Sequence, residues 1–180
     1  MPPQPFRFED RVLERRARPV LRRLPVLVGA PIRIQTLRGL RDTRGPIHGG
    51  AFLRERRIAF DCSLREFPRI FVHEVAHFLW LRLGNPVRHS WEEIVRSELR
   101  ARARGELGWS AEWRKTALRP VHIRARTRRW REYCCESFCD TAAWLYSGVN
   151  RHPEFTLSPR FRRGRQRWFS RIVASKRLSI

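Results

Sequence analysis

Two histidines one helical turn apart, inside a strongly apolar stretch, constrain the fold of this chain more than any other feature. Residues 70–81 read I-F-V-H-E-V-A-H-F-L-W-L, and His73, Glu74 and His77 are the ionisable side chains of that stretch. An apolar run of this length predicts a buried helix. Residues four apart lie on one face of a helix, so both imidazoles are able to reach a single metal ion.

The same residues predict metal-dependent hydrolysis. On a helix, the pattern H-E-x-x-H gives a zinc ion two imidazole ligands and places a carboxylate where it can take a proton from a water molecule. We therefore predict that His73 and His77 bind Zn²⁺ and that Glu74 is the general base. The alternative is a core helix with two incidental histidines, and a second acidic motif downstream argues against it.

A third zinc ligand has to come from elsewhere in the chain, because a catalytic zinc ion needs three protein ligands and one open position. In metzincins a Gly and a third His follow the motif, but Trp80 and Leu83 occupy those positions here. A later segment, E-Y-C-C-E-S-F-C-D, supplies the candidates Glu132, Glu136 and Asp140. These three residues are four apart and line one helix face, so spacing alone does not select the ligand.

The two motifs together resemble the gluzincins, the thermolysin-like zinc metallopeptidases, and also the HtpX-type peptidases without their membrane helices. The resemblance covers residues 50–83 and 127–148, and it departs from those families in the long gap between the motifs. It implies that Glu136 is the third zinc ligand and that Asp140 holds the imidazole of His73. A ligand at Glu132 would require Glu136, with its longer side chain, to take the place of the Asp in E-x-x-x-D.

We predict an α+β fold, with a small mixed sheet packed on helices in a single zincin-like domain that spans residues 1–180. Residues 86–126 are expected to form an inserted basic helical segment, and residues 151–180 a basic C-terminal segment whose apolar residues dock a helix on the core. Helices are expected at 8–24, 67–83, 90–104 and 127–146, and strands at 32–37, 51–53 and 58–60.

The expected substrate is a protein or peptide, held in an extended conformation by edge pairing with the strand at residues 58–60. The spacing of the motifs does not identify the group that stabilises the oxyanion. His122, Tyr133 and Tyr146 are the candidates, because a His or Tyr has this role in gluzincins.

Composition bears on the location of the protein. No apolar run is long enough to span a bilayer. Acidic residues precede the apolar stretch at 24–34, which argues against a signal peptide and favours the cytoplasm. Three of the four cysteines fall within six residues, which is unlike a disulfide framework and is typical of buried thiols in a reducing compartment.

The formal net charge of +22 supports an alternative function. Arginine interleaved with Trp109 and Trp113 in the inserted segment would suit nucleic acid or an acidic protein. The alternative is thus a catalytically inactive zincin-fold regulatory protein that binds nucleic acid or another polyanion. A helical segment with solvated charges is the simpler interpretation of the same residues.

Overall fold

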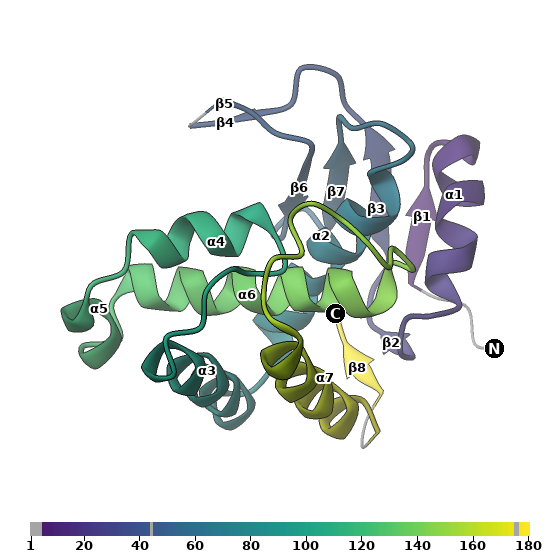
Figure 1. Cartoon of the computed structure of the whole chain (residues 1–180). Coiled ribbons are helices and arrows are strands. Elements are labelled where there is room, and N and C mark those ends of the chain that lie inside the picture. Colours follow the sequence, from purple (N-terminus) through teal and green to yellow (C-terminus); the bar gives the residue numbers. More distant parts are fainter. Residues whose placement is uncertain (1–4, 44, 175–176) are drawn as a thin grey trace.

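The computed structural model describes residues 5–43, 45–174 and 177–180, and shows a four-stranded sheet beside a group of helices (Figure 1). The helices are α1 (Arg11–Leu21), α2 (Phe67–Arg82), α3 (Asn85–Arg100), α4 (Trp109–Thr116), α5 (Pro120–Arg124), α6 (Arg128–Tyr146) and α7 (Pro159–Ala174). The strands are β1 (Phe6–Phe8), β2 (Leu27–Val28), β3 (Ile32–Thr36), β4 (Arg41–Asp42), β5 (Gly45–Pro46), β6 (Gly49–Phe52), β7 (Arg57–Phe60) and β8 (Leu178–Ser179).

The main sheet is mixed and has the strand order β1-β3-β7-β6. Strands β1, β3 and β7 are parallel, and β6 runs antiparallel to β7. Ile34 of β3 lies opposite Ile58 of β7, and both side chains are fully buried. Alternating apolar residues therefore turn one face of the sheet toward the helices, and the mixed sheet with its helices confirms the α+β class.

One prediction about the sheet is wrong. Strand β7, which covers residues 58–60, lies between β3 and β6, so both of its edges are already hydrogen-bonded within the sheet. It therefore has no free edge for a substrate. Strand β6 lies at the end of the strand order and keeps one edge free of any strand among the described residues.

Helix α2 is buried because apolar residues cover nearly its whole circumference. Phe67 and Phe71 pack on Phe60 of β7, with ring centroids 4.9 and 6.3 Å apart. The helix begins at Phe67, and Pro68 lies in its first turn, where a missing N–H leaves no hydrogen bond unmade. On its other side α2 packs along α6.

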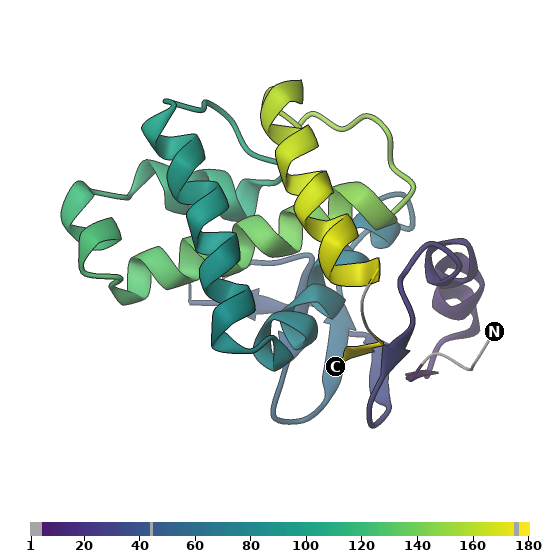
Figure 2. The same ribbon diagram turned by 90° about the horizontal axis from the view of Figure 1, so that it is seen from below.

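The inserted segment folds into helices α3, α4 and α5. Helix α3 begins at Asn85, earlier than the predicted residue 90, because Pro86 fits its first turn. Helices α3 and α7 lie across α6 on one side of the molecule (Figure 2). The predicted docking of the C-terminal helix is confirmed by Trp168 and Phe169, which are buried against Trp91.

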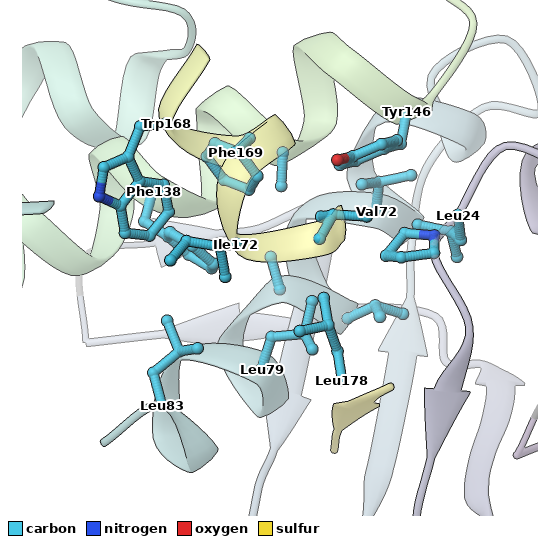
Figure 3. A pocket seen from close by; sticks show the side chains of 15 residues that line it. Leu24, Val72, Leu79, Leu83, Phe138, Tyr146, Trp168, Phe169, Ile172 and Leu178 are labelled. Atoms are coloured by element: carbon cyan, nitrogen blue, oxygen red, sulfur yellow. The ribbon is translucent and has the colours of Figure 1, made fainter. Parts of the chain in front are cut away.

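A small apolar cavity lies where α2, α6 and α7 meet (Figure 3). It has a volume of about 20 Å³, enough for a single water molecule, but its lining offers no polar surface to bind one. Val72, Ala76 and Leu79 line it from one face of α2. The histidines of the motif lie on a different face, so this cavity is a packing gap of the core.

A buried ion cluster joins α7 to the inserted segment. Arg165 is fully buried and contacts Glu98 and Glu106, each at 2.7 Å. Burial alone would lower the pKa of Arg165, but the two carboxylates outweigh it and raise that pKa. The cluster fixes the chain around residue 106, which leads directly into α4.

None of the helices in the described part of the chain combines the length and the apolar character that crossing a membrane requires.

Candidate metal centre

Helices α2 and α6 bring the three predicted zinc ligands together. His73 Nε2 lies 3.2 Å from Glu136 Oε2, and His77 Nε2 lies 3.9 Å from the same oxygen. The two imidazole centroids are 5.0 Å apart. The Nε2 atoms of both histidines thus face one carboxylate oxygen, which is the donor set of two nitrogens and one oxygen that a catalytic zinc ion accepts.

Asp140 fixes the orientation of the first imidazole. Its Oδ1 lies 2.8 Å from His73 Nδ1, and its Oδ2 accepts a hydrogen bond of 2.9 Å from the backbone N–H of Ala111 in α4. Nδ1 is then the protonated nitrogen, which leaves the lone pair of Nε2 for a metal. Gly108 makes this close approach possible, because a Cβ there would lie 2.3 Å from the Asp140 carboxyl group.

The alternative ligand Glu132 points elsewhere. Its carboxylate accepts a hydrogen bond of 2.7 Å from Arg128, one turn away on the surface of α6, and the side chain is 39% exposed. Of the two candidate ligands, Glu132 and Glu136, it is Glu136 that lies against the imidazoles.

Two thiols beside the site were not predicted as part of it. Cys135 Sγ lies 3.5 Å from His77 Nδ1, so a thiol faces the second imidazole on the side where Asp140 faces the first. The spacing of Cys135 and Cys139, one turn apart on the helix that carries Glu136, was the available signal in the sequence.

Cys139 offers a competing donor set, because ligand atoms of His73, His77 and Cys139 lie within 4.8 Å of one another. Both Nε2 atoms face Glu136 instead, and we therefore favour Glu136 as the third donor.

The charges at the site favour a bound cation. Burial would raise the pKa of Glu136, but the neighbouring imidazoles lower it to about 2. Burial would lower the pKa of His77, but its contacts with Cys135 and Glu136 raise it to about 9. Acidic groups thus surround both imidazoles, and this donor set fits a divalent metal ion.

Glu74 lies beside this donor set. The residue is 7% exposed, and burial raises the pKa of its carboxyl group although the two imidazoles oppose the shift. The backbone of Ala51 in β6 also acts to lower this pKa. A Cβ at Gly49 would lie 3.4 Å from Glu74 Oε1, so β6 passes directly over the predicted base.

A cleft of about 850 Å³ opens over these residues. Its floor includes the residues of the proposed site, His73, Glu74, His77 and Glu136. One wall comes from β6 and includes Gly49, Gly50 and Ala51. The other wall comes from α4 and includes Trp109, Ser110, Trp113 and Arg114. This volume suits several residues of an extended peptide, and the two tryptophans are 68% and 47% exposed.

The three predicted oxyanion donors do not line the cleft. Tyr133 is buried and donates a hydrogen bond of 2.7 Å to Glu106. Tyr146 lines the apolar cavity on the other side of α2 (Figure 3). His122 lies in α5, where it accepts a hydrogen bond from the backbone of Arg119. None of these three candidates therefore faces the proposed metal site in this structure.

Comparison with protein-family models, curated proteins and solved structures finds no match for this chain. Its function is therefore inferred from the site itself.

Proposed function

We propose that the protein is a zinc-dependent metallopeptidase of the gluzincin type, which hydrolyses peptide bonds in protein or peptide substrates. One observation carries the proposal: the Nε2 atoms of His73 and His77 converge on Glu136, while Asp140 holds the opposite side of the first ring. This contact between two helices far apart in the chain supports the pairing that the motifs H-E-x-x-H and E-x-x-x-D predict.

His73, His77 and Glu136 would hold the zinc ion. Zinc bound there would polarise the scissile carbonyl and acidify a water molecule. The acidic residues of the site thus have separate roles in the proposal, since Glu136 binds the metal, Asp140 orients an imidazole, and Glu74 transfers a proton.

Glu74 is the general base of the proposed reaction. It takes a proton from the attacking water as the oxygen of that water bonds to the carbonyl carbon, and it returns the proton to the amine nitrogen as the C–N bond breaks. Its raised pKa makes the carboxylate a better proton acceptor than an exposed Glu.

The free edge of β6 is the proposed docking site for the substrate backbone. Gly49, Gly50 and Ala51 line the cleft, and their small side chains leave the main chain accessible. An extended peptide can add to such an edge through main-chain hydrogen bonds. A cytoplasmic site of action belongs to the same proposal, because the four cysteines are free thiols.

The proposed activity is tested with denatured, fluorescein-labelled casein. Protein loaded with one equivalent of zinc is expected to cleave it, 1,10-phenanthroline to abolish the cleavage, and added zinc to restore it. Cleavage that continues unchanged after the metal has been removed, or zinc-loaded protein that does not cleave any denatured substrate, would contradict the proposal.

A further inference from the structure

Peptide hydrolysis builds negative charge on the carbonyl oxygen, and a preorganised donor aimed at that oxygen is worth about 10²–10³-fold in rate. The candidates His122, Tyr133 and Tyr146 lie away from the cleft. We propose that Arg114, on α4, supplies the donor. This inference rests on the proposed peptidase function and assigns a further catalytic residue to the same site.

Arg114 lies beside the proposed ligands. Its Nη2 is 3.1 Å from Glu136 Oε1, while the other oxygen of that carboxylate faces both imidazoles. The guanidinium group is therefore separated from the metal-binding atoms by a single carboxylate. Arg114 lines the cleft, and its side chain is 20% exposed. A substrate carbonyl placed over the site comes within reach of this group.

The guanidinium group of Arg114 also has donors to spare. A guanidinium group carries five N–H bonds. Within the described structure, Nη1 donates to the carbonyl of Ser110 at 2.9 Å and Nη2 contacts Glu136, so each of these two nitrogens keeps a second N–H bond for a further acceptor. Arg69 also lines the cleft, but its Nε, Nη1 and Nη2 all donate to Glu66 and Glu154.

Arg114 is held in place by the same contacts that build the metal centre. Asp140 accepts hydrogen bonds both from His73 and from the backbone of Ala111, one turn before Arg114. The position of α4 is therefore coupled to the orientation of the first imidazole. A donor fixed in this way needs little reorganisation when charge develops during the reaction.

In the proposed role, no covalent bond of Arg114 forms or breaks. When the water oxygen bonds to the carbonyl carbon, the carbonyl π electrons move to its oxygen, and Arg114 donates a hydrogen bond to that oxygen. Glu74 holds the proton from the water. When the C–N bond breaks, the C=O double bond forms again and the proton passes from Glu74 to the amine.

The test compares Arg114→Ala with Arg128→Ala, an exposed arginine of α6 that lies outside the cleft. Each purified protein is assayed for zinc by mass spectrometry, for turnover of labelled casein, and for binding of the phosphoramidate N-phosphoryl-leucyl-tryptophan by calorimetry. The phosphoryl oxygens of this probe imitate the charged oxygen of the reaction. Turnover is also measured with millimolar guanidinium chloride.

Arg114→Ala is expected to keep one zinc per chain and to lose about 10²–10³-fold in kcat, with little change in KM. Its affinity for the phosphoramidate should fall in parallel, and guanidinium should restore part of the turnover in this variant alone. Arg128→Ala should match the wild type in every measurement.

Loss of zinc from Arg114→Ala would overturn the inference, because Arg114 would then serve only to position Glu136. Unchanged kcat, or unchanged binding of the phosphoramidate, would overturn it as well. If the proposed peptidase function itself is wrong, the result is different, because the zinc-loaded wild type and Arg128→Ala would then both be inactive.

Discussion

Asp140 is the residue that joins the two halves of the proposed site. Its two carboxylate oxygens bond to different parts of the chain, one to His73 in α2 and the other to the N-terminal turn of α4. The short side chain suits this position, because the residue is 2% exposed and Gly108 packs against it. A single carboxylate thus sets both the orientation of an imidazole and the position of a cleft wall.

The identity of the third ligand can be decided with single substitutions on one helix face. Glu136→Ala is expected to abolish stoichiometric zinc, because it removes the oxygen that faces both imidazoles. Asp140→Ala should weaken zinc binding by about 10–100-fold, the usual loss for a residue that orients a ligand. Glu132→Ala should leave zinc binding nearly unchanged. The measurement is the zinc content and affinity of each purified variant.

Cys139→Ala is the control for the competing donor set. It should retain zinc if Glu136 is the ligand, and cobalt-substituted wild type should lack the near-ultraviolet charge-transfer band of a cobalt–thiolate bond. Zinc lost from Cys139→Ala but kept by Glu136→Ala would show that the thiol, and not the carboxylate, completes the site.

At the scale of elements, the approach of α4 to α6 depends on Gly108. A Cβ at this position would lie 2.3 Å from the Asp140 carboxyl group, which is held on both sides and cannot move without losing a hydrogen bond. Gly108→Ala is therefore expected to reduce zinc affinity by about 10–100-fold, as Asp140→Ala does. Isothermal titration with zinc measures the effect.

Gly164→Ala is the matched control. It lies within α7 with no atom near its would-be Cβ, so it should raise stability by about 0.4–1 kcal/mol without changing zinc affinity. Equal zinc affinity in Gly108→Ala and in the wild type would show that Asp140 does not orient the ligand.

The second element-scale contact is the cluster around Arg165. Arg165→Met leaves Glu98 and Glu106 buried without their main counter-charge, which is expected to cost about 3–5 kcal/mol of stability at neutral pH. Burial alone would raise the pKa of Glu106, but Arg165 outweighs burial and lowers it below the ordinary 4.5.

In the wild type, the stabilisation from Glu106 is therefore complete above about pH 4.5 and is lost as the pH falls through its lowered pKa. In Arg165→Met the charge of Arg165 no longer opposes the effect of burial on the pKa of Glu106. Protonation of Glu106 at acidic pH therefore reduces the loss of stability. Urea unfolding at neutral pH and at about pH 4 should show a smaller difference between the two proteins at the acidic pH. Exposed Arg163→Met should stay within about 0.5 kcal/mol of the wild type, and a similarly small effect for Arg165→Met would contradict this account.

The main elements of the site could be predicted from local patterns. The apolar run around His73 and His77 and the turn-flanked helix around Glu136 give α2 and α6 directly. The contacts between distant elements could not be predicted in this way. Three features depend on how the elements pack: the burial of Arg165, the closeness of Gly108 to Asp140, and the position of β7 inside the sheet. The local pattern of apolar residues does not indicate that packing.

At the scale of the whole molecule, exposed arginines of the described residues gather on helices outside the cleft. Arg69 and Arg114 line the cleft, and both are paired with acidic residues. Exposed arginines instead follow one face of α7, at positions 160, 163, 167 and 171. A polyanionic partner attracted by the net charge of +22 would therefore bind away from the proposed reaction site.

A salt titration tests for such a partner. Arg126 cannot serve as a probe, because it bonds to Glu92 through Nε and Nη2. Arg124, Arg129 and Arg131 are exposed and have no side-chain partner in the described structure. Affinity for a short single-stranded DNA should fall steeply with salt, and replacing these three arginines by Glu should reduce the slope of log K against log salt by up to about 0.7 per arginine. A flat salt response would remove nucleic acid as a partner.

The proposal as a whole depends on metal-dependent hydrolysis through Glu74, and the variant Glu74→Gln isolates that step. The substitution leaves His73, His77 and Glu136 untouched but removes the base. We predict one zinc per chain, as in the wild type, together with a loss of about 10²–10⁴-fold in the rate of casein hydrolysis. A zinc-loaded variant that hydrolyses casein at the wild-type rate would contradict the proposed mechanism.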